Sequence, residues 1–144
     1  MGPVAFRELY SGAGSIAGRT DWMIVVHTPE AWRRIAPALQ AQRDLAKLQF
    51  DWPKSVALLI QTPPSGDSAH VFHIESMSAS ATATEVRVEL KATGQGPGPS
   101  IGTPVLRPSL IVAEADAAAF REAAPVQLQM PGIRPPPSAV LHER

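Results

Sequence analysis

Alternating apolar and polar side chains identify residues 84–92 as a β-strand. Val86, Val88 and Leu90 fall on one face of an extended chain, and charged residues fall on the other. This period of two is typical of an antiparallel strand with one buried and one solvated face. We therefore predict a strand here, with its apolar face turned toward a core.

Shorter apolar runs predict further strands. Residues 22–27 (WMIVVH) and 55–61 (SVALLIQ) have the length and composition of strands that are buried on both faces. We expect residues 62–68 to turn the chain so that the next strand returns beside 55–61 as a hairpin. The small, Gly-rich segment 11–20 is expected to be a mobile loop. The other predicted strands are 6–10, 70–77, 105–113 and 126–130.

A helix is predicted over residues 29–40. Thr28 can cap it, Pro29 suits its first position, and Glu30 favours the positive end of the helix dipole. Pro37 lies inside this range and is tolerated only near a kink or a break. One apolar stripe follows at helical spacing and is expected to pack on a sheet: Trp32, Ile35, Ala36 and Leu39.

These elements predict the α+β class. We expect one domain over residues 1–130, with an antiparallel sheet of about five to seven strands, sandwich-like or a half-barrel, packed by one main amphipathic helix. Asp116 can cap a short Ala-rich helix to residue 122, and residues 131–144 are expected to be an extended Pro-rich tail. The helix stripe should share a core with Trp22, Val25, Phe50, Val56, Leu58, Ile60, Phe72, Ile74, Val86, Val88 and Leu90.

Composition narrows the class of protein. The 144 residues, 44% of them apolar, suffice for one folded domain, and 13 basic residues balance 13 acidic ones. This balance argues against a nucleic-acid partner. The chain has no cysteine, which excludes disulfides, zinc–thiolate sites and thiol catalysis. The Ala-, Pro- and Arg-rich composition is consistent with a high-GC bacterial genome.

Localisation is left open by the sequence. No apolar run approaches the roughly 18 residues of a membrane span. The first residues, MGPVAFRELYSG, lack the basic and apolar regions of a secretory signal. We expect a cytoplasmic protein if the chain is full length, and an exported or periplasmic one if a leader has been removed.

The segment 94–102 (GQGPGPSIG) has the composition of a phosphate-binding loop but not its pattern. Its glycines fit neither of the common nucleotide-binding spacings, and Pro97 and Pro99 remove two amide donors. An apolar strand follows it, whereas a phosphate loop leads into a helix. We predict that the segment only turns the chain, and we expect no cofactor.

Candidate catalytic groups lie apart from one another in the sequence. Ser15 lacks the G-x-S-x-G context of an activated serine. His70 and His73 would point to opposite faces of a strand, which does not favour a metal site. His27 and His142 have no partner that the sequence identifies. We assign no catalytic or metal-binding residue. A small-molecule-binding domain, or a small hydrolase with a site near His70 and His73, remains the alternative.

Residues 22–113 contain, in order, a helix bearing Trp32, the pair Phe50-Asp51, the strand 56–60, the alternating strand 86–90, the loop 96–99 and a strand containing Pro108. This order of features resembles the PrcB family, named for a non-catalytic subunit of a bacterial surface protease complex. The family has the order Asp-Phe where this chain has Phe50-Asp51. It has Gly-Gly-Tyr where this chain has 68–70 (SAH).

The resemblance implies an exported, non-enzymatic domain that contacts a protein partner. We therefore expect a non-catalytic interaction domain, accessory to a protease or envelope complex. A strand containing Pro108 must be an edge strand or carry a bulge, and an edge could pair with a partner's extended segment. The predicted surface combines this edge with loops 62–69 and 94–104. Its candidate residues are Pro64, Ser65, Gly66, Asp67, His70, Gly96, Pro97, Gly98, Pro99 and Pro108.

Overall fold

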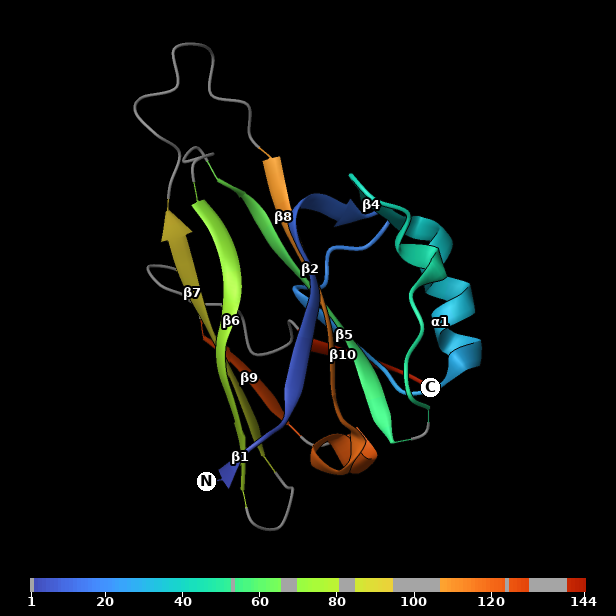
Figure 1. The fold of residues 1–144 in the computed structure, drawn as a ribbon, viewed down its shortest axis with the longest axis vertical. Helices are drawn as coiled ribbons and strands as arrows, with labels where there is room; N and C mark the ends of the chain where they lie inside the picture. The colour runs from blue at the N-terminus through green and yellow to red at the C-terminus, as the bar shows by residue number, and fades with distance from the viewer. Residues whose placement is uncertain are drawn as a thin grey trace.

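Two β-sheets pack face to face in the computed structural model (Figure 1). The structure describes residues 2–52, 54–65, 70–80, 85–94, 107–123, 125–129 and 140–144. The large sheet has six strands in the order β10-β3-β5-β8-β2-β4, and the small sheet has four in the order β1-β6-β7-β9. The sheets are largely antiparallel and one main helix accompanies them, so the predicted α+β class is confirmed.

The large sheet contains β2 (Phe6–Ile16), β3 (Met23–Val26), β4 (Leu39–Ala41), β5 (Ser55–Ser65), β8 (Arg107–Asp116) and β10 (Val140–Glu143). The small sheet contains β1 (Gly2–Pro3), β6 (His70–Ala79), β7 (Val86–Gly94) and β9 (Val126–Gln129). The α-helix is α1 (Pro29–Ile35), and the 3-10 helices are η1 (Ala36–Ala38), η2 (Leu45–Lys47) and η3 (Ala117–Ala123). Asp116 accepts a hydrogen bond from the Ala118 amide, as expected of a cap, although η3 is a 3-10 rather than an α-helix.

The large sheet separates two hydrophobic cores. The inter-sheet core contains Val25, Val56, Leu58, Ile60, Phe72, Ile74, Val86, Val88, Leu90 and Phe120. The helix-side core contains Ile24, Val26, Trp32, Ile35, Phe50, Leu59 and Val112. Successive residues of β3 and β5 point into opposite cores, which explains their continuous apolar runs. The predicted core residues are buried, except that Trp22 and Leu39 are partly buried, but they divide between two cores instead of sharing one.

The main helix is shorter than predicted. The Thr28 hydroxyl accepts a hydrogen bond from the Ala31 amide at 3.1 Å, so the predicted cap is confirmed. The α-helix ends at Ile35, because Pro37 has no N–H to continue the bonding, and Leu39 begins strand β4. The prediction of a helix to residue 40 was therefore wrong. Leu39 still contacts the helix-side core, but from a strand.

The Gly-rich segment 11–20 is mostly strand, not the predicted mobile loop. β2 continues to Ile16 and pairs with β4 over Gly14–Ile16. A Cβ atom on Gly14 would lie 2.6 Å from the main-chain oxygen of Gln40, so glycine permits this close pairing. Small residues here allow two backbones to approach.

Gln61 fixes the turn that follows β2. Its side chain is buried, with Oε1 accepting from the Ile16 amide at 3.1 Å. Its Nε2 donates to the main-chain oxygens of Arg19 at 2.9 Å and Asp21 at 2.7 Å. Gly18 adopts a positive φ of 74° within this turn. Gln61 thus satisfies three backbone groups of the turn, and backbone hydrogen bonds from Ala17 to Ala38 and from Arg19 to Ile16 hold the rest of it.

β5 and β6 do not form the predicted hairpin. β5 pairs with β3 on one side and with β8 on the other, so neither of its edges is available for the next strand. The chain therefore crosses to the small sheet, where β6 pairs with β7 from His70↔Gly94 to Ala79↔Val86. The alternating strand predicted at 84–92 is β7, with Val86, Val88 and Leu90 buried as expected.

Pro108 lies in a central strand. β8 pairs with both β5 and β2, so the edge-strand alternative was wrong. The bulge alternative is correct, because Thr62 pairs with Ser109 and Ser65 pairs with Arg107, which leaves two β5 residues opposite Pro108. The bulge accommodates the missing N–H without interrupting the sheet.

The last strand was not predicted. Residues 140–143, expected to be part of an extended tail, form β10, which runs parallel to β3 at one edge of the large sheet. The preceding residues 131–139 of that expected tail lie outside the described residues. β9 also makes a parallel pair, with β7, so the sheets are not purely antiparallel.

Candidate functional site

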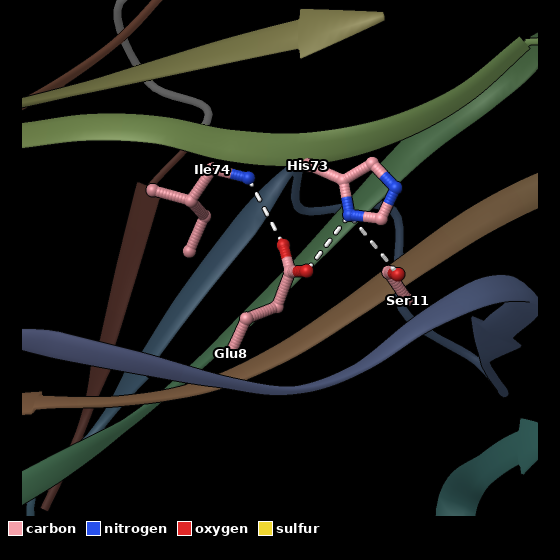
Figure 2. Close-up of polar contacts among 4 residues, drawn as sticks. All are labelled: Glu8, Ser11, His73 and Ile74. Atoms are coloured by element: carbon pink, nitrogen blue, oxygen red, sulfur yellow. Dashed lines mark hydrogen bonds and ion pairs between the residues drawn. The ribbon is translucent and has the colours of Figure 1, made fainter. Parts of the chain in front are cut away.

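Four residues from different sheets meet where β2 passes β6 (Figure 2). The Glu8 carboxylate lies 2.8 Å from His73 Nδ1 through Oε2, and its Oε1 accepts from the Ile74 amide at 3.0 Å. The Ser11 hydroxyl lies 3.2 Å from the same His73 Nδ1. The side chains of His73 and Glu8 retain 31% and 24% of their exposure, so solvent reaches the group. We call these four residues the Glu8 cluster.

Bulges in both strands lie next to the Glu8 cluster. The register of β2 against β8 shifts between Glu8 and Tyr10, and that of β6 against β7 shifts between Ile74 and Ser76. A bulge changes the direction of neighbouring side chains, so these irregularities account for Glu8 reaching across to the other sheet. No sequence pattern identifies either bulge.

The facing sides of β2 and β6 have no paired strand at the Glu8 cluster, within the described ranges. β4 pairs with β2 only from Gly14 onward, and β1 pairs with β6 only at Ser78 and Ala79. The Ile74 amide therefore points to an open strand edge, where the Glu8 carboxylate satisfies it. Glu8 thus joins the two sheets at this corner.

The geometry of the Glu8 cluster does not make Ser11 an activated nucleophile. An ionised carboxylate only accepts hydrogen bonds, so the contact with Glu8 places the proton on His73 Nδ1. A protonated Nδ1 cannot accept the hydroxyl proton of Ser11, which is its neighbour on the same atom. In a serine–histidine–acid relay the serine and the acid contact different ring nitrogens. His73 Nε2 points away from both oxygens (Figure 2).

The structure places few of the predicted site residues together. His73 joins the Glu8 cluster, whereas His70 begins β6 and its side chain is not described. Ser15 hydrogen-bonds Gln40 at 3.3 Å, away from any histidine. Pro64 and Ser65 end β5, and Pro108 lies in β8. The remaining candidates lie outside the described residues: Gly66, Asp67, Gly96, Pro97, Gly98 and Pro99.

Four strand ends nevertheless lie at one end of the sandwich (Figure 1). Ser65 at the end of β5 pairs with Arg107 at the start of β8, and His70 at the start of β6 pairs with Gly94 at the end of β7. The connections 66–69 and 95–106 leave from these ends. The predicted interaction loops 62–69 and 94–104 therefore lie next to strand ends at one end of the molecule, although residues 62–65 of the first belong to β5 and were wrongly predicted as loop.

A second cluster contains two histidines that the sequence left without partners. His27 Nε2 lies 2.9 Å from His142 Nδ1, and the rings are stacked with their centroids 5.2 Å apart. Burial, together with the positive charge of Arg144 and the neighbouring His142, lowers the pKa of His27 from 6.5 to about 4. His27 is therefore neutral at neutral pH. The two residues are 115 positions apart, so no local pattern could have paired them.

An open hollow of about 420 Å³ lies beside the start of β2. Arg7, Lys54, Glu114 and Asp116 contribute both signs of charge to its lining. Arg7 pairs with Glu114 at 3.2 Å, and the second oxygen of Glu114 accepts from the Asp51 amide at 2.8 Å. The lining therefore carries two basic and two acidic side chains, with no excess of either charge.

Comparisons with known proteins give no match among family models, curated proteins or solved structures. The resemblance to the PrcB family therefore stays a prediction. In the described part of the chain, no group of three or more His, Cys, Asp or Glu residues is arranged to hold a metal ion. None of the helices described combines the length and apolar character needed to cross a membrane.

Proposed function

We propose that the chain is a non-catalytic protein-interaction domain that binds its partner at the end of the sandwich from which connections 66–69 and 95–106 leave. The observation that carries the proposal is the convergence of four strand ends, Ser65, His70, Gly94 and Arg107, at one end of the molecule. Strands packed on two buried cores make a rigid base, and loops on such a base are a common place for binding residues.

This surface replaces the edge strand that the sequence suggested. β8 lies between β5 and β2 over Ser109–Ala115, so most of β8 has no free edge for a partner's strand. The candidate residues in the loops can contact a partner without a free edge at β8. The resemblance to the PrcB family favours a protease or envelope complex as the partner, and the balanced charge of the chain favours a protein over a nucleic acid.

Loop replacement tests the proposal. Residues 66–69 and 95–106 are each exchanged for Gly/Ser linkers of equal length, which leaves the paired strands β5–β8 intact. The control exchanges 81–84, because Ala79 and Val86 place that connection at the other end of β6 and β7. Partners recovered by affinity capture from the source organism should be lost with the first two variants and kept with the control. Equal recovery with all three variants would place the interaction elsewhere.

The Glu8–His73 pair favours a second candidate, a small hydrolase or small-molecule site. Glu8 occupies Nδ1 and orients the ring, which leaves Nε2 to accept a proton from water or a substrate. Ser11 would be dispensable in such a reaction because it contacts only Nδ1. In a hydrolase and phosphatase screen, activity lost in His73→Gln and Glu8→Gln but kept in Ser11→Ala would support this candidate over the interaction domain.

A further inference from the structure

β10 covers one side of β3 in the large sheet. If β10 were absent, that side of β3 would be the most apolar strand edge among the described residues of this sheet. All four β3 residues, Met23–Val26, are 0% exposed. β5 pairs with one side of β3, and β10 pairs in parallel with the other, from Val140↔Met23 to Glu143↔Val26. Without β10, this edge would present unpaired amide and carbonyl groups between apolar side chains, which is a template for another strand.

Polar contacts hold β10 in one register. The Arg19 guanidinium pairs with Glu143 at 3.2 Å, and the Glu143 main-chain oxygen accepts from the His27 amide at 2.9 Å. The Arg34 guanidinium donates to the main-chain oxygen of Arg144 at 2.9 Å. These contacts join β10 and the residue after it to three separate segments of the chain. The β3 edge is therefore a site with a defined direction and defined charge partners.

β10 itself has few attachments to the cores. Its four residues are only partly buried, with Val140 against the inter-sheet core and Leu141 against the helix-side core. Short edge strands with exposed hydrogen bonds open at a lower free energy than the interior of a sheet. We therefore expect β10 to open more readily than the interior strands of the large sheet.

We propose that the β3 edge is a strand-exchange site at which β10 of a second copy of this chain pairs in the same register. The occupant is inferred from complementarity, because every contact that β10 makes within one chain can be made identically by the same residues of another chain. Exchange of one identical element between copies is a low-cost route to a dimer. Ten residues, 130–139, connect β9 to β10 in the sequence, and a chain of that length spans at most roughly 33–36 Å.

The absence of cysteine from the chain permits a direct test. Leu141 and Ile24 are register partners, and both contact the helix-side core, so cysteines at these positions should form a disulfide. A chain with Ile24→Cys is mixed with a chain with Leu141→Cys, incubated at high concentration and oxidised. Exchange predicts a covalent dimer that contains one of each chain, and a tenfold excess of cysteine-free protein should reduce its yield about tenfold by competition.

Two controls decide the outcome. The double variant Ile24→Cys/Leu141→Cys should close a disulfide within one chain at low concentration, which shows that the variants fold and that the register is right. Lys91→Cys is exposed on β7 of the small sheet and should not link to Ile24→Cys. The proposal is overturned if the double variant closes but the mixed single variants stay monomeric, or if Lys91→Cys links as readily as Leu141→Cys.

Discussion

Acidification should destabilise this protein through His27. The unfolded residue has a pKa near 6.5 and the folded residue about 4, so the unfolded state binds more protons between these values. The free energy of unfolding therefore falls as the pH falls from about 6.5 to about 4, and this contribution changes little below that window. One pKa unit corresponds to about 1.4 kcal/mol, so the full lowering would correspond to about 3 kcal/mol, and solvent screening of this partly exposed ring reduces the expected contribution to about 1–2 kcal/mol.

The structure gives the physical cause of this effect. Burial penalises a charge on His27 first, and the charges of Arg144 and His142 add repulsion. The 2.9 Å contact between His27 Nε2 and His142 Nδ1 needs one nitrogen as donor and the other as acceptor. Protonation of both rings removes the acceptor, so the contact is lost when the second proton binds.

Urea unfolding of the wild type and of His27→Gln measures the effect. Between about pH 7 and about pH 4.5, the wild type should lose about 1–2 kcal/mol more than the variant, because glutamine does not titrate in this range. The comparison removes the contributions of all groups that the substitution leaves unchanged. An equal loss in the two proteins would refute the assignment of the pH dependence to His27.

Four further variants test the packing and the polar contacts by urea unfolding. Trp32→Ala should lower the free energy of unfolding by about 3–5 kcal/mol, and a change below about 1 kcal/mol would mean that the ring is not buried. Trp32→Phe should lower it less, since Nε1–H has no acceptor among the described residues. Gln61→Ala should cost about 2–4 kcal/mol by leaving three backbone groups without their partner, and a neutral result would show that water replaces the side chain. Gly14→Ala should cost about 1–3 kcal/mol because its Cβ would lie 2.6 Å from the Gln40 oxygen, and an unchanged midpoint would mean that β4 moves freely. Glu8→Ala should lower the free energy of unfolding by about 1–3 kcal/mol by leaving the Ile74 amide unpaired, whereas Glu8→Gln should lose less because its amide oxygen can still accept from Ile74. Equal losses in the two variants would contradict this role of the Glu8 carboxylate.

Local patterns were sufficient to predict several elements. The alternation at residues 84–92 predicted β7, continuous apolar runs predicted β3 and β5, and Thr28 marked the start of α1. These features follow from which faces of a segment are buried, and that information lies within the segment. The helix end was also signalled, by Pro37, but the apolar residue at Leu39 suggested that the stripe continued.

Pairing between segments could not be predicted in the same way. The turn residues at 62–68, of which 62–65 still belong to β5, indicate that the chain reverses, but not that β3 and β8 already pair with both edges of β5. The candidate site has the same difficulty. Glu8 and His73 are 65 positions apart, and their contact depends on two bulges that have no signature in the sequence. Charged and polar residues are common on the solvent-exposed faces of strands, so neither Glu8 nor His73 could be recognised as a site residue from its own position in the sequence.

The pairing of β3 with β10 has a consequence for synthesis on the ribosome. β3 is translated before β10, its partner on one side, which follows only after more than a hundred further residues, as the separation of 115 positions between His27 and His142 illustrates. A nascent chain therefore carries the apolar Met23–Val26 segment with that edge unpaired while these residues are added, and contacts of such high sequence separation form slowly. We expect the nascent protein to depend on chaperone binding at this segment until β10 emerges.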